Sequence, residues 1–189
     1  MKNKESIIEE DTEWEEKIID LTKKDIGQFH PLYEKYFKKI FLYIYHKTNE
    51  RDISADLTSQ VFVKALTNIH QYQRKGASFS SWLFRIAHNE VMQLFRSNSR
   101  QRWVTIDDHM LEGLLEDSQG PDYEMLEKNM HLIINELEIQ EVQLLELKYF
   151  DNKSYKEMGV ILNMTETNVK TKTWRVIEKI RKKIKEINE

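Results

Sequence analysis

The sequence has no cysteine, only two prolines and only five glycines among its 189 residues. Without cysteine the chain forms no disulfide and no cysteine-ligated zinc or iron–sulfur site, so a cytoplasmic location is expected. The longest clean apolar run, from Ile40 to Tyr45, is far shorter than the roughly 20 residues that cross a bilayer. We therefore expect no membrane insertion and no secretory leader.

The scarcity of glycine and proline leaves few places where a helix must break. Few segments alternate apolar and polar residues as strands do, so the sequence predicts an all-α fold. Hydrophobic residues make up 40% of the chain, which is enough for a core in each of two small helical domains. We expect an acidic N-terminal tail or helix over residues 1–23, a first domain over 24–102, an acidic linker over 103–122 and a second domain over 123–189.

The net charge of −3 conceals segments of opposite sign. Counting Lys and Arg against Asp and Glu, residues 1–20 sum to −5 and residues 105–141 to −10. Residues 71–103 sum to +5 and residues 170–185 to +7. Each expected domain therefore carries one basic patch, and such clusters are typical of nucleic-acid-binding surfaces.

The segment over residues 154–180 predicts two helices that meet at a short turn. Ser154 with Glu157 three residues later forms a capping box that starts the first helix. Asn163 tolerates the left-handed conformation that ends this helix, and Thr165 can cap the next one. The pattern predicts a helix-turn-helix, a motif whose second helix enters the major groove of DNA.

The second helix of this motif has an apolar face and a basic face. Helical spacing places Val169, Thr173, Val176, Ile177, Ile180 and Ile184 inward. The outward candidates for contact with bases and phosphates are Thr165, Thr167, Asn168, Lys170, Thr171, Trp174 and Arg175. The alternative is an ordinary helical hairpin with a solvated basic face. Gly159 counts against this alternative, because a missing side chain lets the two helices approach closely.

A second candidate surface lies in the first domain, where a loop containing Gly76 leads into a helix that Ser80 or Ser81 is expected to cap. The DNA-contacting candidates are Tyr72, Arg74 and Lys75 of the loop and Arg85, Asn89, Gln93 and Arg96 of the helix. Aromatic and basic side chains together suit single-stranded nucleic acid, which needs stacking and charge neutralisation. Tyr72 is the best loop candidate for stacking, whereas Trp82, Phe84 and Phe95 are expected in the core.

Three segments, in this order, resemble the extracytoplasmic-function (ECF) sigma factors of the sigma-70 family, the minimal sigma subunits of bacterial RNA polymerase. They read ADLTSQVFVKAL (residues 55–66), FSSWLFRIAHNEVMQLFR (79–96) and LLELKYFDNKSYKEMGVILNMTETNVKTKTWRV (144–176). The resemblance implies sigma region 2 in the first domain, sigma region 4 in the second, and no region 3. It implies a bacterial cytoplasmic protein that directs promoter-specific transcription initiation and is not an enzyme.

The resemblance also implies partners, namely core RNA polymerase, promoter DNA and an anti-sigma factor. Polymerase would be engaged through its β′ clamp helices and β flap, with Asp56, Ser59, Gln60 and Lys64 as candidate contacts to the clamp helices. The loop over residues 71–78 and the helix bearing Asn89, Gln93 and Arg96 would read and open the −10 element. Region 4 would read the −35 element. The chain departs from the family pattern at residues 59–60, where Ser-Gln replaces the usual Gln-Glu.

Other classes of function fit the sequence less well. We find no nucleophile–base constellation, no phosphate loop and no histidine pattern typical of a metal site, so no cofactor is expected. Asp107, Asp108 and His109 suggest a metal-dependent nuclease, but a charged linker explains them better. Two alternatives stay open. One is a helix-turn-helix regulator that works without polymerase, and the other is a helical adaptor that binds only proteins.

Overall fold

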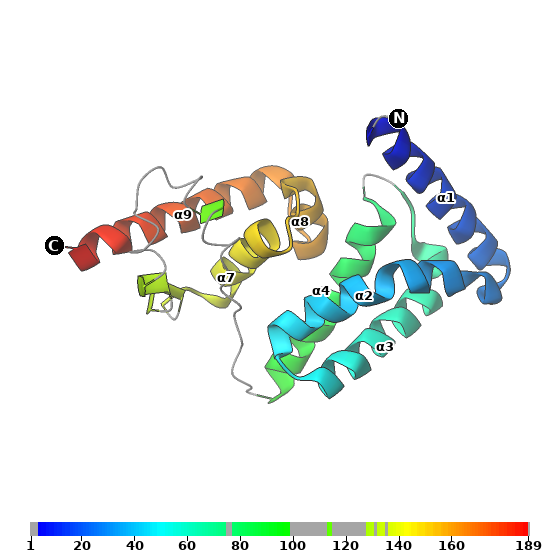
Figure 1. Ribbon diagram of the computed structural model, residues 1–189, viewed down its shortest axis with the longest axis horizontal. Coiled ribbons are helices and arrows are strands. Elements are labelled where there is room, and N and C mark those ends of the chain that lie inside the picture. The colour runs from blue at the N-terminus through cyan, green and yellow to red at the C-terminus, as the bar shows by residue number, and fades with distance from the viewer. Residues whose placement is uncertain are drawn as a thin grey trace. The chain divides into compact units, whose positions relative to one another are not determined.

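The computed structural model describes residues 4–74, 77–98, 113–114, 128–130, 132–134 and 136–188. The regular elements within these ranges are all helical, which confirms the expected all-α fold. The chain divides into two compact units, residues 1–102 and residues 103–189. Blue to green helices form the first unit and yellow to red helices the second in Figure 1. None of the described helices is long and apolar enough to cross a membrane.

The first unit is a helical bundle. Its helices are α1 (Lys4–Lys24), α2 (His30–Thr48), α3 (Arg51–Thr67) and α4 (Phe79–Asn98), with 3-10 turns η1 (Ile26–Phe29) and η2 (Ile69–Gln71). Helices α2, α3 and α4 pack on one another and surround a core that includes Ile40, Val61 and Leu83 (Figure 1). Helix α4 therefore has one face covered by α2 and α3 and one face in solvent.

A tight corner joins α2 to α3. Asn49 adopts the left-handed conformation with φ 51° and donates its N–H to the carbonyl oxygen of Tyr45, which ends α2. The buried hydroxyl groups of Thr48 and Ser54 lie 2.8 Å apart across the corner. These contacts fix α3 beside α2, so the outer face of α3 is presented on a firm support.

The second unit contains α7 (Ile139–Leu145), the π-helical turn η3 (Glu146–Phe150), α8 (Tyr155–Leu162) and α9 (Glu166–Asn188). Its core includes Leu114, which the sequence placed in the linker and which is only 1% exposed. A Cβ atom added to the neighbouring Gly113 would lie 2.6 Å from Cδ1 of Tyr149. These two residues of the expected linker therefore pack within the second unit.

Candidate nucleic-acid interface

The helix-turn-helix predicted from the sequence is present as α8 and α9. The Oγ of Ser154 accepts the Glu157 backbone N–H at 3.3 Å, and the Glu157 carboxylate accepts the Ser154 backbone N–H at 2.9 Å. Asn163 is left-handed with φ 56° and ends α8. The Thr165 hydroxyl accepts the Asn168 backbone N–H at 3.3 Å and caps α9. The three capping predictions are thus confirmed.

Gly159 lies where α8 meets the turn. A Cβ atom at this position would stand 2.8 Å from the carbonyl oxygen of Met164, closer than Cβ atoms normally approach a backbone atom. The absence of a side chain at Gly159 therefore allows the close approach that the sequence indicated.

Helix α9 separates its two faces as the spacing predicts. Val169, Thr173 and Val176 are buried, and the Thr173 hydroxyl donates to the carbonyl oxygen of Val169 at 2.9 Å. The predicted outward residues are all exposed: Thr165, Thr167, Asn168, Lys170, Thr171, Trp174 and Arg175. Trp174 is 62% exposed, which is unusual for so large an apolar side chain. The N-terminal half of α9 thus presents hydroxyl, cationic and aromatic groups together.

The cationic side chains of α9 fall into two groups. Among the residues that the structure describes, no carboxylate pairs with Lys170 or Arg175 in the N-terminal half. In the C-terminal half, Lys179 pairs with Glu141 at 2.7 Å and Lys183 pairs with Glu136. The positive charge at the start of the helix is therefore not offset by a described carboxylate, whereas part of the charge in the C-terminal half is.

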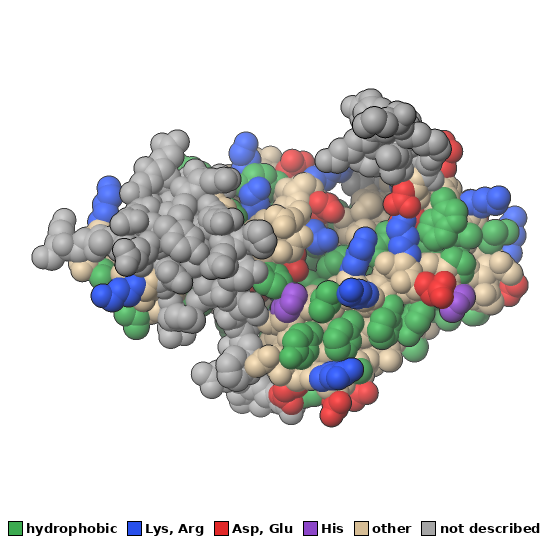
Figure 2. Space-filling model, in the orientation of Figure 1, with side chains coloured by type: hydrophobic (Ala, Val, Ile, Leu, Met, Phe, Trp, Pro, Cys, Tyr) green, Lys and Arg blue, Asp and Glu red, His purple; other side chains and the backbone are tan. Residues whose placement is uncertain are grey.

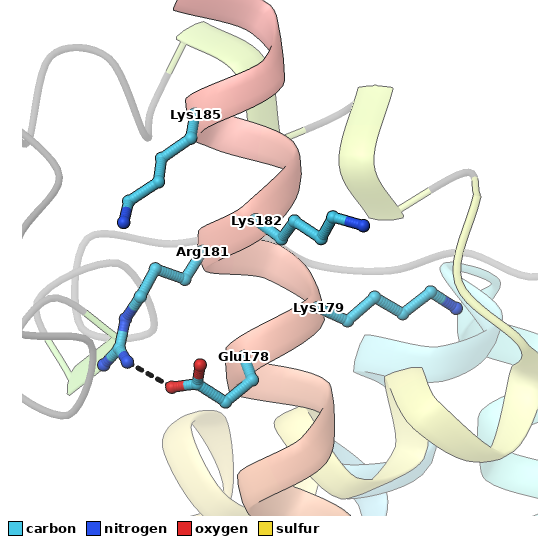
Figure 3. A pocket seen from close by; sticks show the side chains of 5 residues that line it. All are labelled: Glu178, Lys179, Arg181, Lys182 and Lys185. Atoms are coloured by element: carbon cyan, nitrogen blue, oxygen red, sulfur yellow. Dashed lines mark hydrogen bonds and ion pairs between the residues drawn. The ribbon is translucent and has the colours of Figure 1, made fainter.

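A pocket beside the C-terminal half of α9 is lined by Glu178, Lys179, Arg181, Lys182 and Lys185 among the described residues. Arg181 turns toward Glu178 and pairs with it, while Lys179 and Lys182 extend to the other side of the helix (Figure 3). Burial raises the pKa of the Glu141 carboxyl, but hydrogen bonds from Lys179 and from the Glu138 backbone N–H outweigh burial and lower it. These contacts join α9 to α7.

Helix α4 carries the second predicted surface. Asn89, Gln93 and Arg96 are exposed along one side, and Arg85 is half-buried beside them. The opposite side packs Leu83, Ala87 and Val91 into the core, as the spacing predicts. The N-cap prediction was wrong by two or three residues. The Ser81 backbone N–H donates to the hydroxyl of Ser78 at 3.1 Å, so Ser78 caps the helix instead of Ser80 or Ser81.

The ring of Tyr72 is buried and is not exposed on the surface of the loop. Tyr72 is 6% exposed, and its ring centroid lies 5.5 Å from that of Phe79 and 5.3 Å from that of Trp82. Its hydroxyl donates to the carbonyl oxygen of Ala77 at 3.1 Å, and burial raises its pKa to about 12. The prediction of an exposed stacking platform at Tyr72 is therefore wrong. The side chain instead fastens the two ends of the loop to α4.

The other loop candidates differ in what the structure says of them. Arg74 pairs with Glu16 of α1, although its side chain remains 56% exposed. The Lys23 ammonium donates to the Tyr72 carbonyl oxygen at 3.4 Å, so α1 contacts the loop twice. Lys75 and Gly76 lie outside the described residues.

The outer face of α3 presents the predicted polymerase contacts. Asp56, Ser59, Gln60 and Lys64 are all exposed. The Lys64 ammonium lies 2.6 Å from the carboxylate of Glu90 on α4, so this side chain also bridges two helices. Val63 lies on the same face and is 64% exposed. The sequence analysis did not select Val63. The signal was its helical spacing, which places this apolar residue on the same outward face as Gln60 and Lys64.

A row of half-exposed aromatic side chains on α2 was also missed. Phe37 stacks on Phe41 and Phe41 on Tyr45, with ring centroids 6.3 and 6.0 Å apart. Hydrophobic side chains form a row over this part of the surface in Figure 2. The four-residue spacing from Tyr33 to Tyr45 is the signal that indicates such a row.

The candidate metal site suggested by the linker lies outside the described residues, since Asp107, Asp108 and His109 are not among them. Within the described ranges, no three His, Asp or Glu side chains are grouped closely enough to hold a metal ion.

Comparison with known proteins gives two family matches and several relatives. The Sigma-70 region 2 model matches residues 32–101, and the Sigma-70, region 4 model matches residues 127–180. The ECF RNA polymerase sigma factor SigM of Bacillus subtilis is 24% identical over 152 residues, covering 79% of this chain and 91% of the relative. The ECF RNA polymerase sigma factor BldN of Streptomyces coelicolor is 29% identical over 153 residues, covering 79% of this chain and 57% of the relative. A chain from a solved RsbN-BldN complex matches with a TM-score of 0.38 and 22% identity, covering 87% of this chain and 97% of that one.

Proposed function

Because this chain belongs to the ECF sigma factors of bacterial RNA polymerase, we propose that its two basic surfaces divide promoter recognition between them. A sigma factor directs the polymerase to promoters, and matches to both region 2 and region 4 favour this function over a regulator that works without polymerase. The observation that carries this division is the exposed polar and cationic face at the start of α9.

In this proposal α9 reads the −35 element in the duplex. Its contacts would come from Thr165, Thr167, Asn168, Lys170, Thr171, Trp174 and Arg175. The N-terminal part of a helix-turn-helix recognition helix reaches base edges in the major groove, where Lys and Arg bind guanine and Thr binds the thymine methyl group. The absence of a described carboxylate partner for Lys170 and Arg175 supports this role, since both cations are then available to the DNA.

Region 2 would read and open the −10 element. Arg74 and Lys75 of the loop and Arg85, Asn89, Gln93 and Arg96 of α4 are the proposed contacts, with Tyr72 as the internal support of the loop. Unstacking and flipping a base costs a few kcal/mol, and base stacking with charge neutralisation offsets that cost. We infer that strand opening is driven by binding energy and that the protein is not an enzyme.

Core polymerase would dock on the outer face of α3. Asp56, Ser59, Gln60 and Lys64 supply polar contacts in this proposal, and the exposed Val63 supplies an apolar contact on the same face. The β′ clamp helices are the proposed partner of this face, and the β flap is the proposed partner of region 4. An anti-sigma factor is the further partner expected of this family, and the bacterial cytoplasm is the expected location.

The test is reconstitution with core polymerase. The full chain should co-purify with core enzyme and direct initiation from specific start sites, which transcript mapping after overexpression would identify. The free chain should bind promoter duplex weakly, since each domain is small and the acidic segments repel phosphates. Tight, sequence-specific footprints by the free chain in physiological salt would instead support the polymerase-independent regulator.

A matched pair of variants tests the docking face itself. Val63→Asp places a charge within the proposed interface, whereas Leu42→Asp places one at an exposed apolar residue of α2. We expect Val63→Asp to weaken co-purification with core enzyme much more than Leu42→Asp does. Equal co-purification of the two variants would contradict the assignment of this face.

A further inference from the structure

The acidic helix α1 reaches the loop that is proposed to read the −10 element. The Glu16 carboxylate pairs with the Arg74 guanidinium across 58 residues of sequence. The Lys23 ammonium contacts the carbonyl oxygen of Tyr72 at the start of the same loop. The segment that the sequence predicted as an acidic tail or helix therefore contacts a proposed DNA-binding residue directly.

Glu16 is held in place by its neighbours on α1. The adjacent Glu15 is buried, accepts a hydrogen bond from the Tyr36 hydroxyl and lies 2.7 Å from the Lys35 ammonium. Lys35 also pairs with Asp11 at 2.6 Å. Burial raises the pKa of Tyr36, and the neighbouring Glu15 carboxylate raises it further, so the phenol stays protonated as the donor. These contacts fix α1 on α2, and they hold Glu16 in a defined position beside the loop.

A carboxylate beside Arg74 changes what this arginine can bind. Attraction between a guanidinium and phosphates is electrostatic and independent of sequence. A neighbouring negative charge cancels much of that attraction and repels the phosphates itself. Because the Arg74 side chain remains 56% exposed, its guanidinium N–H groups that are not bonded to Glu16 can donate to base edges. The pair therefore weakens the sequence-independent part of binding more than the base-specific part.

We propose that Glu16 is a specificity-determining residue of the −10 site, which suppresses sequence-independent binding of single-stranded DNA by Arg74. This inference rests on the proposed role of the loop in region 2. It assigns a function to the acidic N-terminal helix, whose charge opposes the basic patch of the same unit.

The experiment measures the affinity of the full chain for a labelled single-stranded DNA of random sequence at low salt. Glu16→Gln removes the carboxylate charge and keeps the side-chain shape. Glu13→Gln is the matched control, because Glu13 is an exposed acid on the same helix and its loss changes the net charge equally. We expect Glu16→Gln to bind the random strand about two- to fivefold more tightly than Glu13→Gln, the range that an exposed ion pair accounts for.

The Arg74→Ala background separates the effect of the Glu16–Arg74 ion pair from the effect of a change in net charge. If Glu16 acts mainly through Arg74, the difference in affinity between Glu16→Gln and Glu13→Gln should become smaller when Arg74 is absent. Equal binding of the two Gln variants in the presence of Arg74, or weaker binding by Glu16→Gln, would overturn the inference. An unchanged preference for the −10 element in the Arg74→Ala holoenzyme would instead overturn the proposed role of Arg74 in the loop, so the two failures are distinguishable.

A second measurement uses the reconstituted holoenzyme. Once a start site is mapped, transcription is compared between its promoter and a copy with a shuffled −10 element. The ratio of transcription from the intact promoter to transcription from the shuffled copy should fall in Glu16→Gln and stay at the wild-type value in Glu13→Gln. A ratio that is unchanged or raised in Glu16→Gln would contradict the role in specificity.

Discussion

The two units hold their proposed DNA-binding residues in different ways. At the start of α9, Lys170 and Arg175 are exposed and have no described carboxylate partner. In the first unit, Arg74 pairs with Glu16 and Tyr72 is buried, and the proposed polymerase contact Lys64 pairs with Glu90. Region 4 thus offers a surface that is ready to dock on a duplex. Region 2 offers one whose charges are partly satisfied within the chain, which fits the strand-opening role proposed for it.

The largest effect is expected at the open surface of α9. Lys170→Ala and Arg175→Ala should each weaken −35 recognition by about 1 to 3 kcal/mol where the side chain contacts a base edge. A contact to phosphate would lower affinity evenly across promoter variants and reduce the salt dependence. Initiation from a series of −35 variants distinguishes the two roles. Stability should not change, since both side chains are exposed, and unaltered initiation would mean that the assigned face is wrong.

The Lys64–Glu90 pair tests the claim that cations in the first unit are committed to internal contacts. Glu90 is 6% exposed, so Lys64→Met would leave a buried carboxylate without its cation. Because Lys64 itself is 47% exposed, we expect a loss of about 2 kcal/mol in the free energy of unfolding, below the loss for a fully buried pair. Urea unfolding measures this loss, with Lys38→Met as the exposed-lysine control.

The double variant Lys64→Met/Glu90→Gln should recover most of that stability, because the unpaired charge is gone. Its affinity for core polymerase then reports whether Lys64 also contacts the enzyme, free of any effect on folding. A loss below about 0.5 kcal/mol in Lys64→Met would place the pair among ordinary surface ion pairs. The two units would then differ less in how strongly their cations are held by internal ion pairs than the structure indicates.

Some of these features follow from local sequence, and others do not. Caps at Ser154, Asn163 and Thr165 depend on residues within one turn, so the sequence predicted them. Helical periodicity likewise predicted the exposed faces of α4 and α9. The N-cap of α4 was misplaced because several serines at residues 78–81 satisfy the same local rule.

What the sequence did not predict depends on contacts between distant residues. Tyr72 is buried because Phe79 and Trp82 fold back over it, and a polar tyrosine in a loop carries no local signal of such packing. The pairing of Arg74 with Glu16 requires α1 to pack against the bundle, which joins residues 58 positions apart. Charge counts over each segment could not show which charges neutralise one another.

Tyr72 offers a smaller effect that tests its role as a support. Tyr72→Phe keeps the ring packing and loses one hydrogen bond to Ala77, so stability at neutral pH should fall by about 1 kcal/mol. The folded-state pKa of about 12 lies above the ordinary value near 10. The contribution of the hydroxyl is therefore fully present below pH 10 and is lost as pH rises toward 12.

Urea unfolding at a series of alkaline pH values compares wild type with Tyr72→Phe, so that other titrating groups cancel. The difference in stability should narrow between pH 10 and 12. A constant difference across this window would mean that the hydroxyl is not buried, and Tyr72 would again be a candidate for stacking on DNA.

The smallest effect concerns the paired half of α9. Hydrogen bonds from Lys179 and the Glu138 backbone N–H outweigh burial and lower the folded-state pKa of Glu141. A lowered pKa contributes stability above the unfolded-state pKa, and this stability is lost as pH falls through the folded-state value. Lys179→Met should thus cost about 0.5 kcal/mol at neutral pH, in the range for exposed pairs, and the variant should lose less further stability on acidification than wild type. Lys182→Met is the control, since Lys182 pairs only with Glu186 on its own helix among described residues. Lys179 lies outside the N-terminal half of α9, which carries the proposed DNA contacts, so −35 recognition should be unchanged in Lys179→Met. Weaker recognition in this variant would extend the DNA-binding surface into the C-terminal half of α9, which pairs with α7.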